Sequence, residues 1–192
     1  ESSTFDGNKA RRLGGAIHIN GSSIVIKDTT FFENTSTDGW GGAIMLYEGN
    51  LEVSGSSTFE GNSAVDGGAV FTGGSEGSNV IKETTFVGNT ATERGGAIRL
   101  YRSTLEVSGS TFKKNVAEEN YGGAIAVNDE SQLLVSGNSF VENKDTIGAG
   151  AVYLYDRSTC EMQGNSFTNN TSWSSGSEIT IHVAKLDDAS EF

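Results

Sequence analysis

The chain has 192 residues, with 13 basic and 25 acidic side chains, and its formal net charge is −12. This charge disfavours nucleic acid and anionic membrane surfaces as partners, because both attract clustered Lys and Arg. No apolar run approaches the ~18 residues of a membrane span, so we expect no membrane insertion by this segment. The single Cys160 cannot close an intramolecular disulfide or complete a zinc set, and we expect neither a metal nor a cofactor.

Two short motifs alternate along the chain. The first is Phe-x-x-Asn, which recurs every 26 to 28 residues, with its aromatic residue at Phe5, Phe31, Phe59, Phe86, Phe112, Phe140 and Phe167 and its amide at Asn8, Asn34, Asn62, Asn89, Asn115, Asn143 and Asn170. The second is Gly-Gly-Ala followed by Ile or Val, which begins at Gly14, Gly41, Gly67, Gly95 and Gly122 and is degraded in two later copies. One period shared by two independent motifs indicates a repeat protein.

Each repeat predicts three short strands. After the paired glycines, apolar residues alternate with other residues, as in Ile98 and Leu100, and this period of two is typical of a strand. A second alternating segment follows, as in Leu105 and Val107, and the third is the Ser/Thr-Phe segment itself. No segment shows the apolar spacing of a helix.

One repeat departs from this pattern at Asn79, which stands where the other repeats have Ile, Leu or Cys. Either the glycine-rich turn before it shifts the strand, or a polar side chain points inward. We favour the shifted strand.

Three strands in about 27 residues cannot bury an apolar face within one repeat, so the repeats are expected to stack as coils. Each strand then pairs in parallel with its counterpart in the next coil, at roughly 4.8 Å. About seven coils form one all-β solenoid over residues 1–181, and residues 182–192 form a tail or cap. In this arrangement the phenylalanines fill the interior, while the asparagines adopt a left-handed corner conformation and link successive coils through their amides.

The alternation of Gly-Gly-Ala-(Ile/Leu/Val) and Phe-x-x-Asn resembles the passenger domains of the polymorphic outer-membrane proteins of chlamydiae. Similar repeats occur in other large cell-surface proteins predicted to be parallel β-helices. The resemblance covers residues 1–181. It implies a right-handed parallel β-helix that is exported to the cell exterior and acts in adhesion.

A catalytic site is not expected. Glu52, Glu106 and Glu161 point outward on alternate coils, about 9.6 Å apart, which touches the upper end of the ~6.5–9.5 Å window for inverting glycosidases. Alternate spacing that keeps like charges off adjacent strands is the simpler interpretation. His18 and His182 lie six coils apart, about 29 Å, and cannot share a metal or a proton.

The strand after the glycines offers a candidate binding face. Its outward columns contain the aromatic residues Tyr47, Phe71, Tyr101, Tyr153 and Tyr155. Exposed rings on a rigid surface suit a sugar or a protein partner, whereas strand propensity alone also explains tyrosine there. Trp40, Tyr121 and Trp173 are interpreted as packing at the edges of turns.

These observations favour a non-catalytic extracellular β-helix that serves as an adhesin, a structural spacer or a filament subunit. Its expected partners are a protein or a glycan at a cell surface, and end-to-end self-association is a further possibility. The alternative is a carbohydrate-binding or polysaccharide-cleaving β-helix that uses the tyrosine face or the glutamate row.

Overall fold

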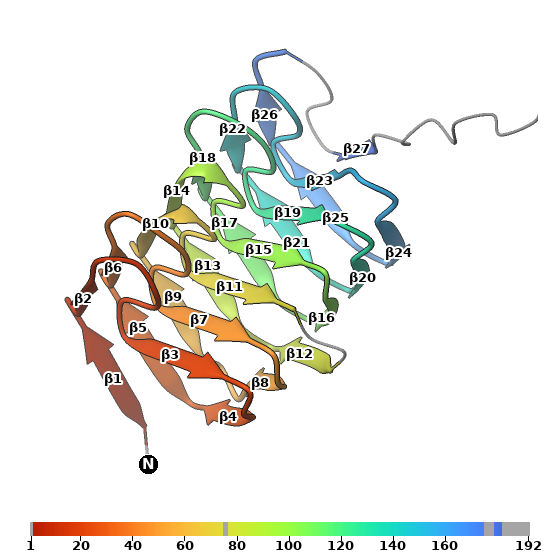
Figure 1. Cartoon of the computed structure of the whole chain (residues 1–192). Helices are drawn as coiled ribbons and strands as arrows, with labels where there is room; N and C mark the ends of the chain where they lie inside the picture. The colour runs from red at the N-terminus through yellow and green to blue at the C-terminus, as the bar shows by residue number, and fades with distance from the viewer. Residues whose placement is uncertain (1, 75–76, 175–178, 182–192) are drawn as a thin grey trace, which may run out of the picture.

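The chain winds into a solenoid of parallel strands, with about 27 residues in each turn (Figure 1). The computed structural model describes residues 2–74, 77–174 and 179–181. These residues form strands and turns without any helix, so none could cross a membrane as a helix. The expected tail at 182–192, together with His182, lies outside the described residues.

Four parallel sheets run along the solenoid. Two of them contain or directly follow the Phe-x-x-Asn motif. Sheet A contains the phenylalanines and consists of β1 (Ser3–Asp6), β5 (Thr29–Phe32), β9 (Thr58–Glu60), β13 (Thr85–Val87), β17 (Thr111–Lys113), β21 (Ser139–Val141) and β25 (Ser166–Thr168). Sheet B follows the asparagines and consists of β2 (Lys9–Ala10), β6 (Thr35–Ser36), β10 (Ser63–Asp66), β14 (Thr90–Arg94), β18 (Val116–Ala117), β22 (Lys144–Asp145) and β26 (Thr171–Ser172). Three strands per coil were expected, and sheet B supplies a short fourth one.

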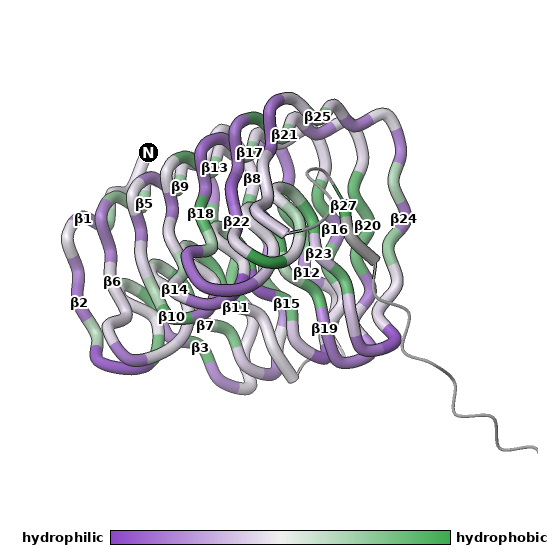
Figure 2. The backbone as a smooth tube through the Cα atoms, turned by 90° about the horizontal axis from the view of Figure 1, so that it is seen from above, coloured by the Kyte–Doolittle hydropathy of each residue, from purple (hydrophilic) through white to green (hydrophobic). Residues whose placement is uncertain are grey.

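The other two sheets follow the paired glycines. Sheet C consists of β3 (Ile17–Asn20), β7 (Ile44–Tyr47), β11 (Val70–Gly73), β15 (Ile98–Tyr101), β19 (Ile125–Asn128), β23 (Val152–Leu154) and β27 (Ile179–Ile181). Sheet D consists of β4 (Ile24–Lys27), β8 (Leu51–Ser54), β12 (Ser78–Lys82), β16 (Thr104–Ser108), β20 (Gln132–Ser136) and β24 (Thr159–Gln163). Seen from above, many of the hydrophilic residues lie in the turns that connect these strands (Figure 2).

A column of phenylalanines forms the centre of the core, as expected. Successive rings lie 4.6 to 4.9 Å apart, with planes within 7° of parallel. Phe59 pairs in register with Phe86, and both side chains are fully buried. Each coil therefore buries its aromatic ring only because the neighbouring coils cover it, which explains why a single repeat cannot fold alone.

The asparagine column links the coils by hydrogen bonds. The Nδ2 atom of Asn89 donates to Oδ1 of Asn115 at 2.9 Å and to the carbonyl oxygen of Phe59 at 2.9 Å, and the same pattern repeats along the stack. The expectation that these asparagines are left-handed was wrong. The left-handed residue is the one before each asparagine, such as Gly88 at φ 60° or Lys114 at φ 56°.

The paired glycines have two different roles. Gly67, the first of its pair, has a φ of 64°, a conformation that glycine adopts without steric cost. Gly68 has no such φ, but a Cβ atom there would lie 2.1 Å from the carbonyl oxygen of Gly96 in the next coil. The second glycine therefore allows neighbouring backbones to approach each other where sheet C begins.

Asn79 points into the core, and the expected strand shift does not occur. It pairs in register with Leu105, its side chain is fully buried, and its Oδ1 atom accepts a hydrogen bond from the backbone N–H of Leu51 at 3.0 Å. Its Nδ2 atom donates to Ser103 Oγ at 2.9 Å. The buried amide is tolerated because these polar partners replace water.

Candidate binding groove

The outer face of sheet C exposes only part of the expected aromatic surface. Tyr47 is 37% exposed, and Tyr101 and Tyr155 are half-buried. Phe71 and Tyr153 are each only 5% exposed, so their assignment to an exposed face was wrong. The outward direction was right, but other rings cover these two side chains.

Residues that precede the glycine pairs provide this cover. The Trp40 ring stacks on Phe71 with centroids 5.2 Å apart, and the Tyr121 ring stacks on Tyr153 at 4.4 Å. Packing at the edge of a turn was the expected role of Trp40, Tyr121 and Trp173. These contacts confirm it for Trp40 and Tyr121, whereas it was wrong for Trp173, which is 84% exposed. The Trp40 and Phe71 rings line a hollow on sheet C.

Two tyrosines on neighbouring sides of a glycine line the hollow. In the outward column at the end of the sheet C strands, Gly73 pairs with Tyr47 on one side and with Tyr101 on the other. The groove has a volume of about 520 Å³, and its lining includes Trp40, Phe71 and Arg99. Its far rim carries Asn128, Asp129, Tyr155 and Asp156.

The groove is continued on the other side of Trp40. This side chain is 42% exposed and also lines a second hollow of about 430 Å³ with Leu13, Asp38 and Gly39. Trp40 bridges in parallel to Leu13 and to Asp66, and it lines both hollows. A ligand long enough to enter both hollows would therefore contact Trp40 in each of them.

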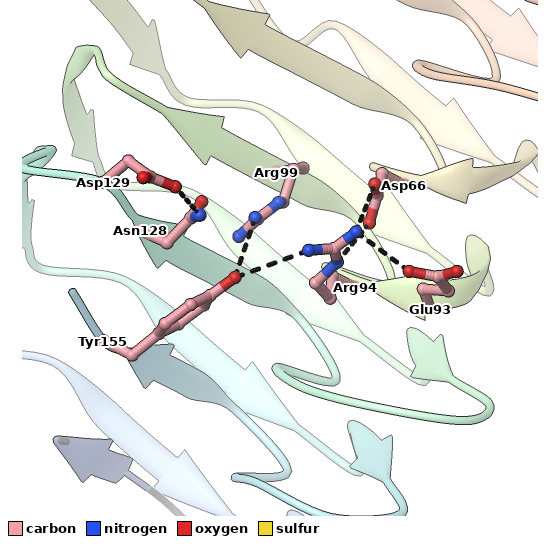
Figure 3. Close-up of polar contacts among 7 residues, drawn as sticks. All are labelled: Asp66, Glu93, Arg94, Arg99, Asn128, Asp129 and Tyr155. Atoms are coloured by element: carbon pink, nitrogen blue, oxygen red, sulfur yellow. Dashed lines mark hydrogen bonds and ion pairs between the residues drawn. The ribbon is translucent and has the colours of Figure 1, made fainter.

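One wall of the groove contains a paired arginine (Figure 3). Arg94 binds Asp66 through two hydrogen bonds, from Nε to Oδ1 at 2.9 Å and from Nη2 to Oδ2 at 3.1 Å. It also contacts Glu93 Oε2 at 2.9 Å. Burial raises the pKa of Asp66, although the neighbouring Arg94 and Arg99 charges oppose the rise. The charge of Arg94 is thus balanced within the protein.

The floor of the groove contains an unbalanced arginine. Arg99 is 2% exposed, and its Nη2 atom donates to Tyr155 Oη at 3.2 Å (Figure 3). The Nε and Nη1 atoms are buried without a hydrogen-bond partner among the described residues, and Arg99 forms no ion pair there. Burial lowers the pKa of Arg99, whereas Tyr155 and Asp66 act in the opposite direction. A buried, incompletely paired cation is costly and favours a ligand that supplies acceptors.

The far rim adds a polar group. Asn128 is buried, and its Nδ2 atom donates to the Asp129 carboxylate (Figure 3). Its Oδ1 atom has no hydrogen-bond partner among the described residues. The groove therefore combines aromatic walls with donors and acceptors that the protein itself leaves unused, which is typical of binding sites.

The glutamate row does not form a comparable cluster. Along sheet D, Val80 separates Glu52 from Glu106, and Leu134 separates Glu106 from Glu161. Glu106 lies 3.8 Å from Lys82 Nζ. In the described part of the chain, no group of three or more His, Cys, Asp or Glu side chains could hold a metal ion. Within this part, the row brings no two carboxylates onto adjacent strands.

The repeat pattern over the whole chain also identifies the family. Residues 2–185 match the family described as the right-handed β-helix region. The chain belongs to this right-handed β-helix family. Comparisons with curated proteins and with solved structures gave no match.

Several groove residues were not singled out as functional from the sequence. Asp66, Arg94 and Arg99 lie on three different strands and come together only through stacking. One signal was present in the sequence, because Arg99 occupies an outward column between Phe71 and Ala126. Gly73 between two tyrosines was the other signal.

Proposed function

We propose that this β-helix repeat protein acts outside the cell as a non-catalytic adhesin, and that it binds a glycan in the groove of sheet C. The observation that carries the proposal is the groove itself, in which Tyr47, Tyr101 and Trp40 surround a buried polar floor. Sugar rings have apolar faces and polar edges, so aromatic side chains beside unused hydrogen-bonding groups match their chemistry.

A rigid scaffold supports this role. Tyr101 and Arg99 stand on β15, which pairs with both of its neighbours, so their backbone positions are fixed before the ligand arrives. Preorganisation of this kind reduces the entropic cost of binding. Repetition along the solenoid adds a second hollow beside Trp40, which suits a chain of several sugars.

A glycan array with the purified protein tests the proposal. We expect binding to a limited set of glycans, and Trp40→Ala should weaken the strongest interaction at least tenfold because the indole lines both hollows. Trp173→Ala is the matched control, since this exposed tryptophan lies after β26 in the last described coils and lines neither hollow. Circular dichroism should show that both variants remain folded.

Two results would overturn this function. One is a protein that binds no glycan on the array. The other is equal weakening by Trp40→Ala and Trp173→Ala. Release of shortened products from an acidic polysaccharide would contradict the non-catalytic part of the proposal and favour a polysaccharide-cleaving β-helix.

A further inference from the structure

We infer that the ligand of this groove is a sugar bearing a carboxylate, and that Arg99 binds this carboxylate. The inference rests on the proposed glycan-binding function and specifies its ligand class. Arg99 supports it because this guanidinium lines the groove without a carboxylate partner in the described residues.

The two arginines of the groove differ in whether a carboxylate balances their charge. Arg94 already binds both oxygens of the Asp66 carboxylate and contacts Glu93. Arg99 is 2% exposed, and among the described residues it has only the neutral hydroxyl of Tyr155 as a hydrogen-bond partner. A planar carboxylate matches the planar fork of a guanidinium and would balance its charge.

The Tyr155 hydroxyl marks where such a carboxylate would bind. Its oxygen lies 3.2 Å from Arg99 Nη2 and 3.5 Å from Arg94 Nη1, so one neutral oxygen stands between two cations (Figure 3). Tyr155 directly follows β23 and is half-buried. A ligand carboxylate oxygen that replaces this hydroxyl would form charge-assisted hydrogen bonds, which are stronger than those of a neutral oxygen.

The rim restricts the charge of the ligand. Asp129 and Asp156 also line the groove and would repel further negative groups. The surroundings therefore fit a sugar with one carboxylate and otherwise neutral hydroxyl groups, and they disfavour a heavily sulfated chain. The exposed ring of Tyr47 would contact an apolar face of the sugar.

Matched oligosaccharides test this inference. Isothermal titration calorimetry would compare neutral tetrasaccharides of glucose, galactose and mannose with counterparts in which one residue is the corresponding uronic acid, so that each pair differs by a single carboxylate in place of one C6 alcohol. We expect at least one acidic sugar to bind at least tenfold more tightly than its neutral counterpart. Added salt should weaken the binding of the acidic sugar and leave the binding of the neutral sugar nearly unchanged.

Three variants assign the preference to Arg99. Arg99→Met should remove the acidic preference and retain neutral binding, and methionine is compatible with this column because Met45 occupies it two strands away. Lys113→Met, on the outer side of sheet A, removes the same charge outside the groove and should keep the preference. Tyr155→Phe removes the competing hydroxyl and should bind the acidic sugar at least as tightly as the unaltered protein.

The outcomes separate this inference from the function on which it rests. Equal affinity for neutral and acidic partners, or an acidic preference that survives Arg99→Met, would overturn the role of Arg99 while glycan binding stands. If Arg99→Met lost binding to both sugars, that result would also contradict the proposed role of Arg99, because it would indicate a structural role. A protein that binds no sugar of either kind would overturn the proposed function as well.

Discussion

At the scale of single residues, Asn115 tests whether the asparagine column stabilises the stack. Its Nδ2 atom donates to Asn143 Oδ1 and to the Phe86 carbonyl oxygen, and its Oδ1 atom accepts from Asn89. Asn115→Ala leaves these buried groups unpaired and should lower the free energy of unfolding by about 2–4 kcal/mol. Urea denaturation measures this change.

Asn8→Ala is the matched control, because the exposed Asn8 only donates to Asn34 at the first strands of the stack. Its cost should stay below about 1 kcal/mol. Equal losses in the two variants would show that position in the stack does not matter.

Tyr153 gives a prediction about alkaline stability. The pKa of Tyr153 is raised to about 12, mainly by burial and to a smaller extent by the charges of the neighbouring Tyr121, Tyr155 and Asp145. The folded protein therefore holds this proton more tightly than the unfolded chain, whose tyrosine pKa is about 10. The associated stability is present below pH of about 10 and is lost as the pH rises towards about 12. Tyr153→Phe should reduce this loss in urea titrations at several alkaline pH values, and identical profiles would contradict the prediction.

At the scale of strands and turns, the second glycine of each pair controls the distance between coils. Gly68→Ala would place a Cβ atom 2.1 Å from the Gly96 carbonyl oxygen and 2.6 Å from that of Thr90. Both atoms belong to the backbone of the next coil, so relief requires the coils to separate. We expect a loss of more than about 3 kcal/mol in the free energy of unfolding, measured with urea.

Gly88→Ala is the comparison for this prediction. Gly88 has a φ of 60°, but a Cβ atom there would meet nothing within 4 Å, and other coils have Glu33 or Lys114 at this position. The cost should be about 1–2 kcal/mol, from the left-handed conformation alone. A larger loss for Gly88→Ala than for Gly68→Ala would contradict the assigned roles.

The sequence predicted the strands that alternate clearly. Sheets A, C and D follow from apolar residues at every second position. Sheet B was missed because strands such as β2 and β18 have only two residues, too few to show a period. Asn79 was misjudged because residue type alone does not reveal the partners that satisfy a buried amide, here Leu51 and Ser103.

At the scale of the whole molecule, the proposed site lies where the repeat is broken. Gly73 replaces a larger residue, and Arg99 stands in a largely apolar column. Trp40 directly precedes its glycine pair, and no other glycine pair follows a tryptophan. The repeat predicted the face on which the groove lies, because it fixes which side chains point outward. It could not predict that Trp40 covers Phe71 within the groove, because that contact joins side chains of different coils.

A crystal structure of the protein with its tightest-binding oligosaccharide tests the central claim most directly. We predict a sugar ring in the groove lined by Trp40, Tyr47 and Tyr101, with its carboxylate about 3 Å from the guanidinium of Arg99. A sugar bound on the outer face of sheet A or sheet D, with the groove of sheet C unchanged, would contradict the claim.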